Sequence, residues 1–329
     1  MAETVLSVDD LVTYVFTDHG RVKAVDGVSL RISSGEAVAL VGESGSGKSM
    51  TAQSLMRLPR PPARILSGTV TFEGRNLLAL SEREMRAVRG GRMGMIFQDP
   101  STYLNPLMRV GEQIAEAVRL HRKVGRSAAR AEALEAMRQV RIPAAETVLD
   151  YYPHQLSGGM RQRILIAMAI TSRPSLLIAD EPTTALDVTV QAQIMRLLAG
   201  LRRELNSALL LITHDLGLVA EFCDRVYVMY GGRIVEEGGV EDVFYRPRHP
   251  YTRALMRSTL GPERRVASFE AIQGNPPNLA HLPSGCSFHP RCPERLARCA
   301  AEAPPLFTPE PGIRSRCWLA EGGADERAA

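Results

Sequence analysis

The sequence lacks any apolar run long enough to cross a bilayer. Its longest runs, such as residues 164–170 (ILIAMAI), have seven residues, whereas a membrane-spanning helix needs about 20. It also lacks a large charge of one sign, because 40 basic and 36 acidic residues leave a net charge of only +4. So small an excess does not by itself indicate a nucleic-acid-binding protein.

The N-terminus lacks the basic start of a secretion signal. It reads Met-Ala-Glu-Thr, with an acid where such a signal carries a base. The sequence also contains no internal repeat and no long low-complexity tract. We therefore expect a soluble chain that stays in the cytoplasm unless a partner holds it at a membrane.

Length and composition indicate a folded protein of about two domains. The 329 residues correspond to roughly two domains of about 150 residues each, and 45% apolar with 23% charged residues is typical of globular chains. Residues 246–316 stand apart, with eleven arginines, five glutamates and twelve of the 21 prolines. Because this proline density disfavours long helices, we expect one domain over residues 1–245 and a small loop-rich domain over residues 246–329.

Residues 1–245 alternate between strand-like and helix-like segments. Residues 49–58 and 110–140 have helical composition, and short apolar runs bounded by turn residues predict strands. The predicted strands are residues 37–41, 70–72, 93–97, 176–179, 208–213 and 226–230, the last of which turns at Gly-Gly into a hairpin with residues 233–236. This alternation predicts an α/β fold with a largely parallel core sheet.

A glycine-rich loop follows the first of these strands. Residues 42–49 (GESGSGKS) fit the pattern GxxxxGK[ST] between a strand and a helix, and this context favours a phosphate-binding loop over a merely flexible one. Backbone N–H groups and the helix N-terminus would surround the phosphates. Lys48 would reach the β- and γ-phosphates, and Ser49 would bind Mg²⁺. The predicted nucleotide-binding residues here are Gly42, Glu43, Ser44, Gly45, Ser46, Gly47, Lys48, Ser49 and Met50.

A second strand ends in two adjacent carboxylates. In residues 176–182 (LLIADEP), Asp180 and Glu181 follow an apolar run. Asp180 would hold the Mg²⁺ shell, and Glu181 would orient and polarise the attacking water. A strand that merely ends in surface acids is the alternative, and the phosphate loop upstream disfavours it.

Residues 156–163 (LSGGMRQR) resemble the signature loop of the ATP-binding-cassette (ABC) ATPases. In that family, N–H groups such as those of Ser157, Gly158 and Gly159 cradle the γ-phosphate of ATP held by the opposite subunit, so two cassettes complete each site. Met160 stands where glutamine is usual, which we interpret as a subfamily mark. The resemblance implies a P-loop NTPase with a RecA-like core, a β subdomain and a helical subdomain over about residues 99–160.

The remaining family motifs follow in order. Gln98 matches the Q-loop, which senses Mg²⁺ and the attacking water; Asp187 matches the D-loop; and His214 matches the switch histidine that contacts the γ-phosphate. Phe16 lies where the family stacks an aromatic ring on adenine, with Tyr14 as an alternative. The resemblance thus implies an ATPase with catalytic residues Lys48, Gln98, Glu181 and His214, and with Mg²⁺ held by Ser49, Gln98 and Asp180.

Two longer segments narrow the resemblance to the ATPases of dipeptide and oligopeptide permeases. These are residues 153–163 and 180–191, and residues 248–252 (RHPYT) before a Cys-rich stretch agree. This subfamily implies peptide uptake at the cytoplasmic face of the cell membrane, with two transmembrane permease subunits, a second cassette (a homologue or the same chain) and an extracytoplasmic peptide-binding protein. Import of nickel, glutathione or another small solute is the alternative. A soluble ABC ATPase acting on nucleic acid is disfavoured, because there is no aromatic stacking array or basic helix.

Four of the five cysteines lie near the C-terminus. Their spacing is C-x5-C-x6-C-x17-C, and clustered cysteines in a cytoplasmic chain indicate a metal or redox site more than disulfides. The residues leave open an iron–sulfur cluster, a Cys₄ zinc site or unconnected thiols. The permease resemblance favours a [4Fe–4S] cluster on Cys286, Cys292, Cys299 and Cys317, with His281 and His289 as lesser candidates and Cys223 as a core residue.

Overall fold

The computed structural model describes residues 3–18, 20–184, 186–259 and 272–321. The chain divides into two compact units, each built from several stretches of sequence. Unit 1 comprises Met1–Val5, Ser33–Glu36 and Ala79–Leu211. Unit 2 comprises Leu6–Ile32, Ala37–Leu78 and Ile212–Ala329.

The strands of unit 1 form a small parallel layer. β6 (Met93–Ile96) pairs in parallel with β7 (Leu176–Asp180), and β8 (Ala208–Thr213) lies on the other side of β7. Every residue of the three strands is buried, which explains why they are apolar rather than alternating except at the ends of β7 and β8, where Asp180 and Thr213 stand. The predictions of strands at these positions are confirmed.

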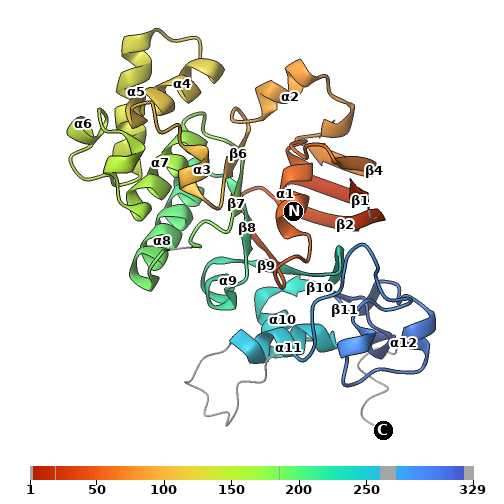
Figure 1. The fold of residues 1–329 in the computed structure, drawn as a ribbon. Coiled ribbons are helices and arrows are strands. Elements are labelled where there is room, and N and C mark those ends of the chain that lie inside the picture. Colours follow the sequence, from red (N-terminus) through yellow and green to blue (C-terminus); the bar gives the residue numbers. More distant parts are fainter. Residues whose placement is uncertain (1–2, 19, 185, 260–271, 322–329) are drawn as a thin grey trace. The chain divides into compact units, whose positions relative to one another are not determined.

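Helices make up the rest of unit 1 (Figure 1). The predicted helical segment 110–140 is interrupted after His121 and forms two helices, α4 and α5. These two helices pack against each other and against α7. The mostly apolar helix α7 buries seven of its residues. The helices are α2 (Glu82–Val88), α3 (Pro100–Tyr103), α4 (Val110–His121), α5 (Arg126–Gln139), α6 (Ala145–Val148), α7 (Gly158–Ile170) and α8 (Val188–Leu205).

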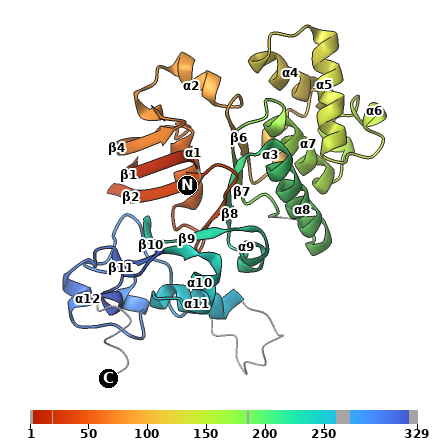
Figure 2. The same cartoon turned by 180° about the vertical axis from the view of Figure 1, so that it is seen from behind.

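Unit 2 contains an antiparallel sheet near the N-terminus. Its strand order is β2-β1-β4-β5, and β1 pairs antiparallel with β4; the strands lie side by side in Figures 1 and 2. Only the end of β4 was predicted from the sequence. The strands are β1 (Thr4–Thr17), β2 (Gly20–Ser33), β4 (Ala63–Phe72) and β5 (Arg75–Asn76).

A second layer of strands in unit 2 carries the phosphate loop. β3 (Ala37–Val41) pairs in parallel with β9 (Arg225–Tyr230), and β9 forms the predicted hairpin with β10 (Arg233–Gly239). Two C-terminal strands, β12 (Ile313–Ser315) and β11 (Phe307–Glu310), extend this layer from β10. Residues beyond 246 therefore add strands to the layer that contains β9.

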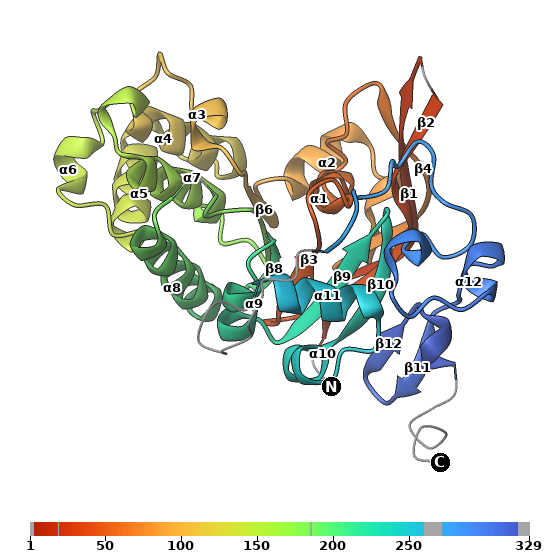
Figure 3. The ribbon, with the colours of Figure 1, turned by 60° about the horizontal axis from the view of Figure 1, so that its bottom comes forward.

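The helices of unit 2 complete its core. α10 contacts α9 and β10, and α11 contacts α9; Figure 3 shows them together. Buried side chains from β9, α11 and the C-terminal segment, among them Tyr230, Tyr251 and Phe288, form one apolar cluster. The helices are α1 (Lys48–Leu55), α9 (Leu216–Phe222), α10 (Val240–Tyr245), α11 (Pro250–Thr259) and α12 (Arg298–Ala301).

Within the residues that the structure describes, no helix combines the length and apolar character needed to span a bilayer.

Candidate functional site

The phosphate loop of unit 2 is shaped by three glycines with positive φ, two of which leave no room for a Cβ. Gly42, Gly45 and Gly47 all have positive φ, at 153°, 77° and 109°, a region that favours glycine. A Cβ on Gly42 would lie 2.2 Å from the carbonyl oxygen of Met229, and one on Gly47 would lie 2.0 Å from that of Ala24. The loop is thus closely packed on its inner side.

The polar groups inside this loop fit a phosphate ligand. Lys48 is 5% exposed, and its Nζ donates to the carbonyl oxygens of Gly42 at 2.8 Å and Glu43 at 2.9 Å. Ser46 is also 5% exposed, and its Oγ has no hydrogen-bond partner among the described residues. An unpaired buried hydroxyl costs free energy, and a phosphate oxygen is a ligand that could accept its hydrogen bond.

The loop leads directly into helix α1. Gly47 occupies the N-cap position, and glycine supplies no side-chain acceptor for the first N–H groups of the helix. Those N–H groups and the positive end of the helix dipole suit an anion. The N–H of Glu43, by contrast, donates to the hydroxyl of Tyr251 at 2.8 Å, so Glu43 has a protein partner in place of phosphate.

In unit 1 the structure brings Gln98 and Glu181 together. Gln98 Nε2 donates to Glu181 Oε2 at 3.0 Å, and Thr184 Oγ1 donates to the same oxygen at 2.9 Å. Glu181 follows β7 with a φ of 46°, which is unusual for a residue with a side chain and is typical of functional sites. Asp180, the last residue of β7, is buried. A carboxylate held by two donors can accept a hydrogen bond from a water in a defined direction.

Thr184 was not assigned a role from the sequence. It lies within residues 180–191, which carried the subfamily resemblance, but no local pattern shows that its hydroxyl faces Glu181. The bond depends on the turn after β7, where Thr184 N–H also donates to the carbonyl oxygen of Glu181 at 3.2 Å.

The signature segment begins helix α7. The hydroxyl of Ser157 accepts from the N–H of Met160 at 3.3 Å and so caps the helix. Ser157 and Gly158 are exposed, whereas a Cβ on Gly159 would lie 2.8 Å from Val190 Cγ1. Exposed N–H groups at a helix start are suited to a phosphate that arrives from outside the chain.

Asp187 and His214 lie at the starts of helices in different units. The Asp187 carboxylate accepts from the N–H of Val190 at 2.9 Å and caps α8 in unit 1. His214 follows β8, lies in unit 2 and is exposed. Its neighbour Asp215 accepts from two backbone N–H groups and caps α9. The proposed nucleotide contacts of Asp187 and His214 stay predictions.

The two candidate adenine-stacking residues differ in their surroundings. The Tyr14 hydroxyl donates to Asp26 Oδ1 at 2.5 Å, and burial together with this carboxylate raises the pKa of Tyr14 to about 12. Phe16 is partly buried, with the guanidinium carbons of Arg21 and Arg64 at 6.0 and 5.7 Å from its ring centroid. Phe16 therefore presents a ring without a polar anchor, and it stays the predicted stacking residue.

The four C-terminal thiols are not gathered into a metal-ligand set. Cys286, Cys292, Cys299 and Cys317 form no disulfides, and among the described residues no three His, Cys, Asp or Glu side chains are grouped to hold a metal. Burial raises the pKa of the Cys286 and Cys292 thiols and that of Cys317 to about 12.

The prediction of a [4Fe–4S] cluster, and of zinc as its alternative, is therefore not supported. Among the described residues, neither His289, whose Nδ1 lies 2.9 Å from the backbone oxygen of Cys286, nor the exposed His281 belongs to a group of three such side chains. Cys223 packs against the apolar cluster of unit 2, which confirms its interpretation as a core residue.

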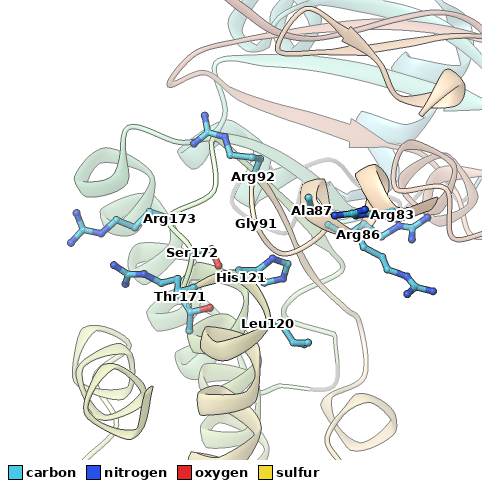
Figure 4. A pocket seen from close by; sticks show the side chains of 12 residues that line it. Arg83, Arg86, Ala87, Gly91, Arg92, Leu120, His121, Thr171, Ser172 and Arg173 are labelled. Carbon is cyan, nitrogen blue, oxygen red and sulfur yellow. The ribbon is translucent and has the colours of Figure 1, made fainter. Parts of the chain in front are cut away.

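A cavity of about 860 Å³ in unit 1 contains none of the predicted site residues. Six arginines and His121 line it, and Arg89 is paired with Glu82 and Arg122 with Glu132. The labelled arginine side chains point in different directions rather than toward one centre (Figure 4). The cavity is therefore separate from the nucleotide loop, and the view shows no focused anion site.

Comparison with protein families identifies the chain. Residues 25–184 match the model "ABC transporter", and residues 235–299 match "Oligopeptide/dipeptide transporter, C-terminal region". A probable peptide ABC transporter ATP-binding protein of Sinorhizobium fredii is 52% identical over 321 residues, which cover 96% of this chain and 95% of the relative. The chain belongs to the ATP-binding subunits of oligopeptide and dipeptide ABC transporters.

Other relatives agree with this placement. The oligopeptide transport ATP-binding protein OppD of Salmonella typhimurium is 50% identical over 317 residues, covering 96% of this chain and 94% of OppD. The dimeric ATP-binding cassette MJ0796, bound to ADP and Pi, matches 71% of this chain and 98% of its own, with 27% identity and a TM-score of 0.65. The predicted fold, an ABC cassette of the P-loop NTPase class with an additional C-terminal region, is confirmed, and the chain is an ABC ATPase.

Proposed function

We propose that this chain hydrolyses ATP to drive the uptake of dipeptides or oligopeptides through a membrane ABC importer. Its family membership supports the transport role. The observation that carries the hydrolytic role is the Glu181 carboxylate, which Gln98 and Thr184 hold at the end of β7. A cassette that only bound ATP would have no need for a carboxylate fixed in this way.

The first step is binding of the triphosphate at the phosphate loop. Lys48 exchanges the carbonyl oxygens of Gly42 and Glu43 for the more negative phosphate oxygens. The N–H groups at the start of α1 and the unpaired hydroxyl of Ser46 supply further donors. Binding therefore replaces weak internal partners of the loop by charged ones.

The hydrolytic step depends on oxygen and amide side chains. Ser49, Asp180 and Gln98 would hold Mg²⁺ through the oxygen ligands that this ion prefers, and the ion would neutralise phosphate charge. Glu181 orients the attacking water and accepts its proton, while His214 contacts the γ-phosphate. Loss of any one contact should be severe, because phosphoryl transfer depends on positioning and charge stabilisation.

The exposed signature segment requires a second cassette. Ser157, Gly158 and Gly159 would bind the γ-phosphate of the ATP held by that cassette, and Asp187 would lie near the same interface. The second cassette is a homologous chain or a second copy of this one. Closure of the pair on ATP and its separation after hydrolysis would drive the transmembrane subunits.

The segment after Gln98 is the proposed docking region for the permease. Residues 99–128 contain Tyr103, Leu107 and Leu120, and Leu107 is 85% and Leu120 75% exposed. Large apolar side chains in water are typical of surfaces that bind another protein. Two transmembrane permease subunits would therefore hold this ATPase at the cytoplasmic face of the membrane, and an extracytoplasmic binding protein would deliver the peptide.

We also propose that the C-terminal region is a functional part of the chain distinct from the ABC cassette. We assign residues 1–245 to the ABC cassette, with its helical subdomain over about residues 99–160, and residues 246–329 to the permease-type extension. The family model for this extension begins at residue 235, ten residues or so before the boundary that composition indicates.

Peptide uptake by the assembled transporter tests the proposal. Wild type should take up labelled dipeptide or oligopeptide into ATP-loaded proteoliposomes, and Lys48→Ala should abolish uptake. Nickel or glutathione in excess should not compete. Uptake of labelled nickel or glutathione, with no uptake of peptides, would replace the proposed substrate by that solute.

A further inference from the structure

Glu43, the second residue of the phosphate loop, is paired with a residue far along the chain. Arg291 Nη1 donates to Glu43 Oε2 at 2.7 Å, and Arg291 Nη2 donates to Oε1 at 3.0 Å. The Arg291 side chain is 6% exposed and that of Glu43 21%. Bidentate pairs of this kind are the strongest ionic contacts in proteins, especially where water is excluded.

Arg291 is itself held rigidly. Its Nε donates to the carbonyl oxygen of Gln273 at 2.9 Å, and Nη2 donates to that of Ile272 at 3.3 Å. Nη1 also donates to the hydroxyl of Tyr230 at 3.3 Å, and the hydrogen bonds to Glu43 raise the pKa of Arg291 further above its usual range. The guanidinium therefore has a fixed position from which to hold the loop.

The backbone of Glu43 is fixed from the same side. Its N–H donates to Tyr251 Oη at 2.8 Å, and the Tyr251 ring is fully buried against the rings of Tyr230 and Phe288. Side chain and backbone of Glu43 are thus both held by residues that follow residue 245. The matching family model covers these residues as the C-terminal region of the transporters.

The charge of Glu43 explains why such a contact is needed. A carboxylate at the start of a phosphate loop repels a triphosphate, and little water is present to screen it. Arg291 neutralises this charge while leaving the loop N–H groups and Lys48 in place. Without Arg291, the carboxylate would remain uncompensated beside the loop that takes the triphosphate.

We propose that Arg291 is a positioning residue for ATP binding: it neutralises Glu43 and, together with Tyr251, holds the phosphate loop ready for the triphosphate. The C-terminal region thereby sets the ATP affinity of the cassette. This inference rests on the proposed ATP site at the phosphate loop.

The test is a double-mutant cycle on the full-length chain, with the Kd of a fluorescent ATP analogue as the readout. Arg291→Gln should weaken binding by about ten-fold or more, because it leaves the Glu43 charge uncompensated. Arg291→Lys keeps the charge and should stay within about three-fold of wild type. The double variant Glu43→Gln with Arg291→Gln should recover most of the lost affinity, although it restores no ion pair.

The cycle separates charge neutralisation from general damage to the fold. A double variant as weak as Arg291→Gln alone, or wild-type affinity in Arg291→Gln, would overturn the inference. Arg295→Ala, an exposed arginine of the same segment, is the matched control and should bind as wild type. Normal ATP binding by Lys48→Ala would instead refute the ATP site itself, so the two failures are distinguishable.

Discussion

The two loops proposed to bind phosphate are held in opposite ways. The phosphate loop of unit 2 is enclosed, with Lys48 buried and Gly47 pressed against the backbone of Ala24. The signature segment of unit 1 is exposed at Ser157 and Gly158, and the Ser157 hydroxyl caps the helix that the segment begins. A loop that binds the chain's own nucleotide is preorganised, whereas a loop that binds a partner's nucleotide is left open to solvent.

A methyl group added to each loop gives the largest expected difference. Gly47→Ala should raise the ATP Kd of the isolated chain by about 100-fold or more, because the new Cβ would lie 2.0 Å from a carbonyl oxygen. Gly158→Ala meets its nearest atom, Leu186 Cδ2, at 3.5 Å, and should leave this Kd unchanged while slowing turnover of the paired cassettes. Isothermal titration with ATP measures both variants.

Gly45→Ala is the control for backbone conformation alone. Gly45 also has a positive φ, of 77°, but a Cβ there would meet nothing within 4 Å. Its loss of affinity should be much smaller than that of Gly47→Ala. Equal losses in the two variants would mean that close packing of the loop does not matter.

Removing one hydroxyl from each loop should have smaller effects, on stability in one variant and on ATP affinity in the other. Ser157→Ala deletes the cap of α7 and should lower the free energy of unfolding by about 1 kcal/mol, with little change in the ATP Kd of the isolated chain. Ser46→Ala removes a buried hydroxyl that has no partner, so stability should stay level or rise while the ATP Kd increases. Urea unfolding measures the stability of each variant, and ATP titration of the same samples measures its Kd. If stability and Kd changed in the same way in both variants, the prediction would be contradicted.

The smallest expected effect is on the pH dependence of stability, through the buried residue His249. Burial lowers the pKa of His249 to about 3, so the folded chain keeps this residue neutral below pH 6.5 whereas the unfolded chain binds a proton. His249 therefore lowers stability as pH falls from 6.5, by up to about 1.4 kcal/mol per pH unit. The buried Glu236 has a raised pKa and acts with the opposite sign.

Comparison with His249→Gln isolates the histidine, because Glu236 is common to both proteins. Between pH 7.5 and 5.5, the wild type should lose more stability than the variant in urea unfolding. Identical pH dependence of the two proteins would show that His249 is not kept neutral by burial.

The sequence predicted the local features of the site well. A strand, a glycine loop and a helix are contiguous at residues 37–55, so the motif and its geometry coincide. The family motifs placed Gln98 and Glu181 separately among the catalytic residues, and the parallel pairing of β6 with β7 brings the two residues into contact. The local sequence pattern accounts for the phosphate loop, and parallel strand pairing accounts for the contact between Gln98 and Glu181.

Other features depend on contacts that leave no local pattern. Strands β1 and β2 were missed, and β1 contains a bulge between Asp9 and Val12 that breaks the alternation expected of a strand. The contact between Glu43 and Arg291 joins residues 248 positions apart. The cysteine spacing left a metal site and unconnected thiols open, and the permease resemblance favoured a cluster; among the described residues no such ligand group is found.

The central claim is that Glu181 performs hydrolysis at a site that binds ATP without it. Glu181→Gln keeps a side-chain oxygen for the bonds from Gln98 and Thr184 but removes the proton acceptor. Measured in the assembled transporter, this variant should bind ATP with a Kd near that of wild type and lose about 10³-fold in kcat. A kcat near that of wild type, or loss of ATP binding together with kcat, would contradict the account.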